Sequence, residues 1–340
     1  MSVASISTYD DHRKGFVMRA LLFDRPAPDA GATRVADLES PLPGHGEVAI
    51  DVRAAGVNFI DVMARRGDPG YATEWPFVPG LEVAGTVRAL GAGVDGPAIG
   101  TPVAAFTGSG GLAEVAVVRA DLVAVIPEGL SFEQAAAAPG TLTTAALLLN
   151  RLQPGESVLV HSAAGGVGQA LASLARLRGA GLLLGTVGGA SRVQAAEKAG
   201  YDAALIRGDG LVEAVRERTG GRGVDLILDP QGTEWIDTDL ELVAPGGRIV
   251  LFGNASGTPL APLALGPLFG GNASVGGFSI RGYSAKAPHL VAAALTDVLG
   301  KLAQGALTVD PTVVDGLDRA AEAQQALADG RGNGKYVVRL

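Results

Sequence analysis

The sequence predicts a two-domain α/β protein in which a β-rich unit is followed by a doubly wound domain with a parallel sheet. The chain has 340 residues, which is long for one domain and comfortable for two. Short apolar runs separated by Gly and Pro fill residues 18–128, a pattern that predicts a compact, barrel-like β unit. From about residue 131 strands alternate with helices, which predicts a parallel sheet with right-handed crossovers.

The first domain is expected to begin at Met18. Residues 1–17 contain no apolar core and include Asp10 and Asp11, so they are predicted to be a disordered extension and not a secretory signal. "MRALLF" then predicts the first strand. Further strands are expected in "EVAIDVRAAGV", "VAGTVRAL", "TPVAAF", "AEVAVV" and "LVAVIP".

The second half opens with "SFEQAAAAPGTLTTAALLLN", which predicts helices with Ser131 as an N-cap. A buried strand over 157–162, a glycine turn over 163–168 and a helix over 169–178 follow. Alternating strands and helices continue to "GGRIVLFG", and a long helix is expected around 286–304. The closing strand "KYVVRL" is too short to stand alone, so it is predicted to return to the β-rich domain.

Composition excludes several classes of function. The formal net charge is −8 without any run of Lys or Arg, which argues against a nucleic-acid or anionic-membrane partner. The chain has no cysteine, which excludes disulfides, thiolate nucleophiles and cysteine-bound zinc and fits a reducing cytoplasm. No apolar run is long enough for a transmembrane helix. The four histidines form no paired-ligand motif, so no metal site is predicted: His12, His45, His161 and His289.

The glycine turn predicts a dinucleotide site. Gly165 would let the backbone approach a pyrophosphate, and Gly168 would let the helix pack close to the strand. The N-terminus of the following helix offers unpaired N–H groups to an anion. Ala163 stands where such turns usually begin with glycine, but it keeps the small size that the position needs; Gly166 and Val167 complete the predicted cofactor turn.

The next strand indicates which dinucleotide binds. NAD sites usually carry an acid about 20 residues further on, whereas this chain has Gly188 and Gly189 there and Arg192 shortly after. Removing a carboxylate and adding a guanidinium favours a 2′-phosphate, so NADPH is the predicted cofactor. The alternative is that Arg192 is a solvated helix residue without a ligand.

Five segments in order resemble the medium-chain dehydrogenase/reductase superfamily, in its zinc-independent, zeta-crystallin-like quinone oxidoreductase and enoyl reductase branch. They are "VRAAGVNFIDVMARRGDPGY", "PFVPGLEVAGTV", "HSAAGGVGQALASLAR", "GVDLILDPQG" and "GKYVVRL". The resemblance implies a GroES-like catalytic domain over 18–137 and 283–340, with an inserted Rossmann NADP(H)-binding domain over 138–282. It also implies a homodimer through a cofactor-domain edge strand, expected at "GGFSIRG".

The resemblance bears on metal chemistry. Zinc-dependent relatives carry two ligands at the positions of Asn58 and Leu81, and Glu82 alone cannot hold zinc. Without a Lewis acid, hydride transfer to a quinone or an α,β-unsaturated carbonyl fits better than alcohol oxidation, because such acceptors delocalise the incoming charge themselves.

Two residues are candidates for catalysis. Asn58 is expected to donate its amide hydrogens to substrate or cofactor; the alternative is a turn residue that bonds its own backbone. Tyr71 lies where the family often has a tyrosine, and its phenol would protonate a developing enolate; the alternative is a loop aromatic without a role. Asp61 is interpreted as a capping residue and not as a base.

The remaining cofactor positions lie at strand ends. Gly253, Asn254 and Ser256 in "GNASG" are expected to line the nicotinamide, since ligands bind at the carboxyl edge of such sheets. Thr144 completes the predicted set, together with Lys335, which matches a lysine near the cofactor in this family; its alternative is a surface lysine.

Two other functions stay open at this point. One is a biosynthetic enoyl reductase that acts on an acyl-linked or cyclic enone, slightly favoured by an aromatic content of 5% that leaves few platforms for a large quinone. The other is an NADPH-binding protein with little turnover, in a structural or RNA-element-binding role, against which the net charge argues.

Overall fold

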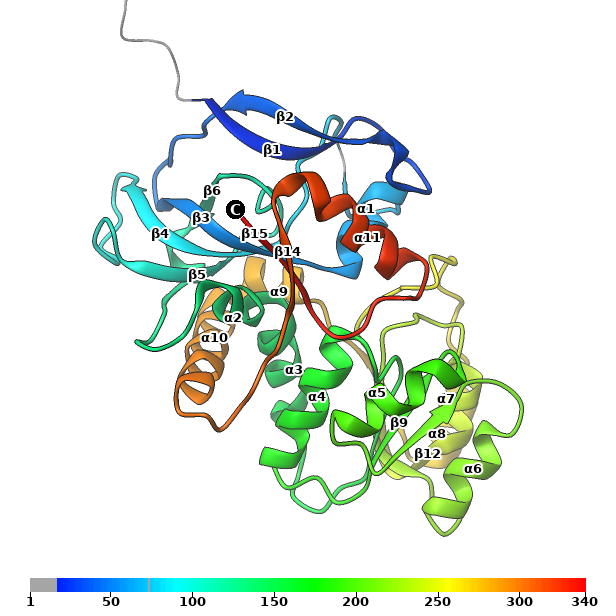
Figure 1. Ribbon diagram of the computed structural model, residues 1–340. Helices are drawn as coiled ribbons and strands as arrows, with labels where there is room; N and C mark the ends of the chain where they lie inside the picture. The colour runs from blue at the N-terminus through cyan, green and yellow to red at the C-terminus, as the bar shows by residue number, and fades with distance from the viewer. Residues whose placement is uncertain (1–16, 73) are drawn as a thin grey trace, which may run out of the picture.

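The computed structural model describes residues 17–72 and 74–340 (Figure 1). Its first element is a two-stranded antiparallel ribbon of β1 (Val17–Phe23) and β2 (Thr33–Glu39). Residues 1–16 of the predicted extension lie outside the described residues. Val17 does not belong to that extension, because it pairs with Glu39 at the start of the ribbon.

A seven-stranded sheet forms the main body of the β-rich domain. Its order is β14-β15-β3-β4-β5-β7, with β6 paired to β3. The final strand lies antiparallel to β3, with Val338 opposite Ala55, so the prediction that the end of the chain returns to this domain is confirmed. The strands are β3 (Glu47–Val57), β4 (Glu82–Leu90), β5 (Pro102–Phe106), β6 (Val115–Arg119), β7 (Val123–Val125), β14 (Thr312–Asp315) and β15 (Tyr336–Arg339).

Helix α1 (Phe59–Arg66) directly follows β3 and carries the first candidate motif. Asp61 accepts a hydrogen bond from the Asn58 N–H at 2.8 Å, so the interpretation of Asp61 as a cap is confirmed. The helix ends at Gly67, whose φ of 79° places it in the left-handed region. Helix α11 (Ala320–Ala328), from the end of the chain, lies beside α1 (Figure 1).

Three helical segments lead from the β-rich sheet to the second domain. The Ser131 hydroxyl accepts from the Gln134 N–H at 3.2 Å, which confirms Ser131 as the N-cap of α2 (Phe132–Ala136). A π-helical turn over Ala138–Leu142 and helix α3 (Thr143–Leu148) follow. The predicted long helix is α10 (Pro288–Ala303), which packs against α3.

The second domain is a six-stranded parallel sheet in the order β10-β9-β8-β11-β12-β13, which is the Rossmann order 3-2-1-4-5-6. The predicted doubly wound fold is therefore confirmed (Figure 1). Its strands are β8 (Val158–Val160), β9 (Leu183–Val187), β10 (Ala203–Ile206), β11 (Val224–Asp229), β12 (Val243–Leu251) and β13 (Ser274–Gly277). Its helices are α4 (Gly166–Leu177), α5 (Val193–Lys198), α6 (Leu211–Arg218), α7 (Ile236–Leu242) and α8 (Leu265–Gly271).

The edge strand is shorter than predicted. "GGFSIRG" was expected to be one strand, but β13 ends at Gly277 and α9 (Ile280–Lys286) begins three residues later. The Ser279 hydroxyl accepts from the Gly282 N–H at 3.1 Å and so caps this helix. Within the described chain, every helix is too short or too polar to cross a membrane.

One buried apolar cluster joins the two domains, because Ala54, Ala84 and Ala104 of the β-rich sheet belong to the same cluster as α3, β8 and α4. In the β-rich domain, buried side chains of the sheet and its loops pack together, with Phe23, Ile50, Phe106 and Leu112 fully inside. In the other domain, β8 packs against α3 and α4 through alanine and leucine side chains. The small alanines let these helices approach the sheet closely, which brings the start of α4 to the boundary between the domains.

Candidate functional site

The glycine turn between β8 and α4 is confirmed as a tight strand-to-helix connection. A Cβ on Gly168 would lie 2.5 Å from the Ser162 carbonyl oxygen and 2.6 Å from that of Ala163, so only glycine fits there. Ala163 is fully buried, and a Cβ on Gly185 would lie 2.5 Å from its methyl group. The helix begins at Gly166, three residues earlier than predicted, so Gly166 and Val167 form its first turn, where N–H groups lack helical partners.

A loop from the end of the chain closes one side of this turn. The Gly334 N–H donates to the Ala164 carbonyl oxygen at 3.2 Å, and Gly165 and Gly334 form a parallel bridge. The Gln169 side chain donates to Asn333 Oδ1 at 3.1 Å. The loop before β15 is thus attached to the predicted cofactor turn, a contact that sequence reasoning missed.

A cavity of about 300 Å³ lies next to this junction. Arg192 donates to the carbonyl oxygens of Gly330 and, at 3.4 Å, Ala164, so it is not a solvated helix residue. Arg331 forms an ion pair with Asp329 at 2.6 Å and brings a second guanidinium to the cavity wall. A positively charged cavity beside a glycine turn fits a phosphate. Its lining is Ser191, Arg192, Ala195, Gly330, Arg331 and Asn333.

The end of β9 holds another arginine that sequence reasoning missed. Gly188 follows the strand, and Arg207 Nη2 lies 3.2 Å from the point where a Cβ of Gly188 would stand. The guanidinium therefore occupies the space above the glycine that replaces the usual acid. The available signal was a basic residue directly after the next strand, in "ALIR".

Two loops meet at the carboxyl edge of the sheet, as predicted. The Ala255 N–H donates to the Pro230 carbonyl oxygen at 2.9 Å, and a Cβ on Gly253 would lie 2.8 Å from that same oxygen. The Asn254 amide donates to the Thr258 carbonyl oxygen at 2.8 Å, and the Ser256 hydroxyl donates to Asn254 Oδ1 at 3.2 Å. Both polar side chains thus hold the loop in shape, and contact with a nicotinamide stays a prediction.

Asn58 and Lys335 belong to one buried cluster around Glu82. Lys335 Nζ donates to the Val57 carbonyl oxygen at 2.9 Å, to Asn58 Oδ1 at 2.7 Å and to the Glu82 carboxylate. Asn58 Nδ2 donates to Glu82 Oε1 at 2.7 Å, and the Gly140 N–H donates to Glu82 Oε2 at 2.5 Å. Glu82 is completely buried and Lys335 is 6% exposed, so Lys335 is not the surface lysine of the alternative interpretation.

These bonds differ from the expected roles of both residues. Asn58 was expected to offer its amide hydrogens to a ligand, yet they point to Glu82 and, at 3.4 Å, to the Gly56 carbonyl oxygen. Lys335 uses its three N–H groups inside the protein. Direct contact of either side chain with a ligand requires an exchange of these bonds and stays a prediction. Within the described residues, no three His, Asp or Glu side chains gather as metal ligands.

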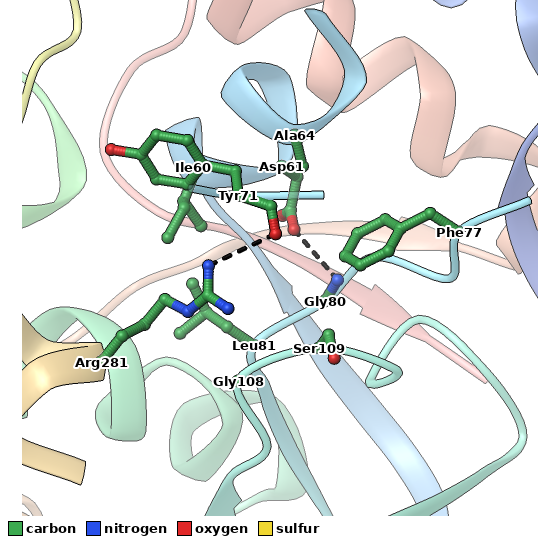
Figure 2. A pocket seen from close by; sticks show the side chains of 10 residues that line it. All are labelled: Ile60, Asp61, Ala64, Tyr71, Phe77, Gly80, Leu81, Gly108, Ser109 and Arg281. Carbon is green, nitrogen blue, oxygen red and sulfur yellow. Dashed lines mark hydrogen bonds between the residues drawn. The ribbon is translucent and has the colours of Figure 1, made fainter. Parts of the chain in front are cut away.

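Tyr71 lines a second, very small cavity of about 10 Å³, the size of one water molecule. Arg281 donates to the Gly70 carbonyl oxygen at 2.9 Å and so connects α9 to this loop. The Tyr71 phenol points away from Gly80 (Figure 2). Burial, helped by Asp68, raises the pKa of Tyr71, so its phenol stays protonated at neutral pH. The lining also includes Ile60, Asp61, Phe77, Leu81 and Ser109 (Figure 2).

Thr144 is buried in the first turn of α3. The π-helical turn before it touches the cofactor turn, because Thr141 Cγ2 lies 3.5 Å from the point where a Cβ of Gly166 would stand. The structure therefore brings the segment before Thr144 to the glycine turn, and contact of Thr144 with a cofactor stays a prediction.

The comparisons with known proteins agree with this geometry. The family model "Alcohol dehydrogenase GroES-like domain" matches residues 44–128, and "Zinc-binding dehydrogenase" matches residues 166–296. An NADPH-complexed mycobacterial protein of solved structure is 31% identical, with a TM-score of 0.87 over 95% of this chain and 100% of its own. The chain belongs to the medium-chain dehydrogenase/reductase superfamily. The resemblance found in the sequence is thus confirmed.

Other members of this superfamily are similar over most of the chain. The NADPH complex of Escherichia coli quinone oxidoreductase is 29% identical, with a TM-score of 0.85 over 95% of this chain and 100% of its own. A phenolphthiocerol/phthiocerol polyketide synthase of Mycobacterium tuberculosis is 33% identical over 91% of this chain and 14% of its own length. The human synaptic vesicle membrane protein VAT-1 homolog-like is 38% identical over 64% of this chain, which spans about half, 52%, of that relative.

Proposed function

We propose that the chain is an NADPH-dependent, metal-free oxidoreductase that transfers hydride to a quinone or to the β-carbon of an α,β-unsaturated carbonyl. The observation that carries this proposal is the glycine turn of α4 beside an arginine-lined cavity of about 300 Å³. The first turn of α4 would bind the pyrophosphate through its N–H groups. Arg192 and Arg331 would bind the 2′-phosphate that distinguishes NADPH from NADH.

Two relatives of solved structure support the choice of cofactor, because both are complexes with NADPH. NADPH supplies the hydride when it is bound. The loops at the carboxyl ends of β11 and β12 would then orient the nicotinamide, since ligands bind at this edge of a doubly wound sheet. Orientation of this kind is the main contribution that a protein makes to hydride transfer.

The residues at the zinc-ligand positions support a metal-free reaction. Asn58 and Leu81 provide no thiolate or imidazole, and the Glu82 carboxylate is already bonded to Lys335, Asn58 and the Gly140 N–H. A conjugated acceptor needs no Lewis acid to stabilise an alkoxide. Tyr71, kept protonated by its raised pKa, would deliver the proton to the enolate or hydroquinone oxygen after its loop turns the phenol inward.

The acceptor class has two forms. Similarity to Escherichia coli quinone oxidoreductase supports a quinone. Similarity to the polyketide synthase, over 91% of this chain, supports an enoyl group carried by a thioester. The cavity at Tyr71 holds only about 10 Å³, so either acceptor requires the Arg281 contact to Gly70 to open.

The test is NADPH oxidation by purified protein with 1,4-benzoquinone, 9,10-phenanthrenequinone, trans-2-hexenal and crotonyl-CoA. We expect turnover with at least one acceptor, unchanged by EDTA. Elemental analysis should find no stoichiometric zinc. Zinc at one ion per chain, or loss of activity with EDTA that added zinc restores, would contradict the metal-free mechanism.

We also propose that the chain forms a homodimer through β13. Among residues 17–72 and 74–340, this strand is the edge of the Rossmann sheet and has β12 as its single neighbour. Helix α8, which directly precedes β13 in the sequence, has no buried residue, and its Leu265 and Phe269 are 71% and 90% exposed. An open strand edge next to exposed apolar side chains fits pairing with the same edge of a second copy.

A further inference from the structure

The end of β9 places a charged group that the predicted site does not use. Gly188 lacks a side chain, and Arg207 Nη2 lies 3.2 Å from the point where its Cβ would stand. Arg207 follows β10, the neighbouring strand, and its N–H bonds to the Val187 carbonyl oxygen at 2.9 Å. The guanidinium therefore folds back over the end of β9. In a Rossmann fold, this is the place where the second strand meets the adenosine ribose.

The Arg207 guanidinium is available to bind an anion. Unlike Arg176, Arg222 and Arg248 of the same domain, it forms no ion pair with a carboxylate of the described chain. Its only side-chain hydrogen bond within the described residues runs from Nη1 to Ser162 Oγ at 3.1 Å. It is half-buried, and burial lowers its pKa, opposed by Asp229 and Glu234 and reinforced by the charge of Arg192. Two guanidinium groups that approach the same glycine turn repel each other unless an anion lies between them.

The partner of Arg207 connects it to the pyrophosphate turn. Ser162 has a φ of 59°, a left-handed conformation that residues other than glycine rarely adopt. Its hydroxyl oxygen accepts from Arg207 Nη1 at 3.1 Å and from Gln231 Nε2 at 2.8 Å. Arg207 is thus held at the first residue of the turn that starts α4. A ligand that bridges the glycine turn and the end of β9 must pass this guanidinium.

We infer that Arg207, whose guanidinium occupies the space above Gly188, binds the 2′-phosphate of the cofactor's adenosine ribose and is a main determinant of the preference for NADPH. This inference rests on the proposed function and names a phosphate-binding residue that the sequence did not indicate. Arg192 has a different position, since it donates to the carbonyl oxygens of Gly330 and Ala164 and so joins the cavity wall to the C-terminal loop. Arg207 faces the phosphate from the β10 side, and Arg192 from the α5 side.

The experiment is calorimetric titration of the whole protein at fixed ionic strength with NADPH, NADH, 2′,5′-ADP and 5′-AMP. Arg207→Ala should weaken NADPH and 2′,5′-ADP about 10- to 100-fold, because a charged hydrogen bond to the phosphate is lost. It should leave NADH and 5′-AMP within about twofold. Arg207→Lys should recover part of the loss, since it keeps the charge without the planar fork.

A reciprocal variant and a matched control complete the test. Gly188→Asp should pair with Arg207, cancel its charge and shift the preference towards NADH. Arg216→Ala removes an exposed arginine of the same domain, paired with Glu241 at 2.8 Å, and should change none of the four affinities. Thermal unfolding of each variant identifies any loss of fold.

The outcomes separate this inference from the proposed function. Equal loss of affinity for NADPH and NADH in the folded Arg207→Ala protein, or no loss of either, would overturn the role of Arg207. Neither result would contradict the binding of NADPH by the wild-type protein. Absence of NADPH binding in the wild-type protein would overturn the proposed function itself. A loss confined to the two ligands that carry a 2′-phosphate supports the inference.

Discussion

Lys335 and Glu82 form a buried ion pair that also holds the Asn58 side chain. The lysine precedes the last strand and the glutamate begins β4, so the pair joins segments that are far apart in the sequence of the β-rich domain. Gly334, the residue before Lys335, forms a bridge with Gly165 in the glycine turn. One ammonium group therefore neutralises the carboxylate, fixes Asn58 and holds the loop that borders the predicted cofactor site.

Lys335→Met should destabilise the protein, because it leaves the Glu82 carboxylate buried without a cation. Breaking such a pair costs about 3 to 5 kcal/mol, measured as the free energy of unfolding in urea. The double variant Glu82→Gln/Lys335→Met should regain much of this loss, since the amide still accepts from Gly140. A Lys335→Met protein as stable as wild type would contradict the role given to this pair.

Asp229 should make stability depend on pH between about 4 and 6. Burial, opposed by His161 and Arg207 and reinforced by Asp239, raises the pKa of Asp229 to about 6 from 3.8. Because the folded state binds the proton more tightly than the unfolded state, this contribution is fully present below about pH 4. It is lost as pH rises through about 6.

Asp229→Asn removes this titration while its Oδ1 still accepts from the Gln231 N–H, a bond of 2.6 Å in the native protein. Between pH 4 and 7, the free energy of unfolding should fall less in the variant than in the wild type, with a difference of up to about 3 kcal/mol. Urea unfolding at several pH values measures this difference. Asp61, whose pKa burial also raises to about 6, titrates in both proteins and so cancels in the comparison. Parallel stability curves for the two proteins would show that Asp229 does not control this range.

Local signals in the sequence were sufficient for much of the fold. Ser131 and Asp61 were predicted as caps because a cap depends on residues three positions apart, which the sequence shows directly. The glycine turn and the alternation of strands and helices are local in the same sense. The strand predicted at "GGFSIRG" failed because Ser279, a polar residue inside it, caps a helix instead.

Long-range neighbours were beyond prediction from the residues alone. Arg207 reaches Gly188 only because β9 and β10 are adjacent in the sheet. Arg331 and Asn333 reach the arginine-lined cavity because the C-terminal loop contacts the other domain. The sequence indicated the chemistry of Lys335 near the site but not its burial against Glu82, which depends on the pairing of β15 with β3.

Gly168 and Gly165 should respond differently to alanine. A Cβ on Gly168 meets main-chain oxygens at 2.5 and 2.6 Å, which cannot move without breaking the turn, so Gly168→Ala should lower stability by about 1 to 3 kcal/mol or more. A Cβ on Gly165 meets only the Ser162 carbonyl oxygen, at 3.2 Å. Gly165→Ala should therefore fold nearly normally, and Gly165→Val should lose NADPH before it loses its fold. Retained NADPH affinity in a folded Gly165→Val protein would show that the pyrophosphate binds elsewhere.

Arg192→Ala should weaken NADPH by about 1.5 to 3 kcal/mol, the value of a charged hydrogen bond, and leave NADH nearly unchanged. Its contacts with Gly330 and Ala164 also fix the cavity wall, so 2′,5′-ADP should weaken as well. Fluorescence titration with both dinucleotides measures the effect. Equally weakened NADH binding would show that Arg192 maintains the shape of the cavity and does not bind the phosphate.

Phe269→Asp should convert the proposed homodimer into monomers. Phe269 is 90% exposed on α8, next to the open edge of β13, so the change places a charge in the proposed interface without disturbing a core. Ile99→Asp is the matched control, because Ile99 is 69% exposed in the β-rich domain, far along the chain from β13. Sedimentation velocity should give a dimer for wild type and for Ile99→Asp, and a monomer for Phe269→Asp. Wild-type protein that sediments as a monomer at all concentrations would rule out this interface, whereas a dimer that persists in Phe269→Asp would place the contact on another face.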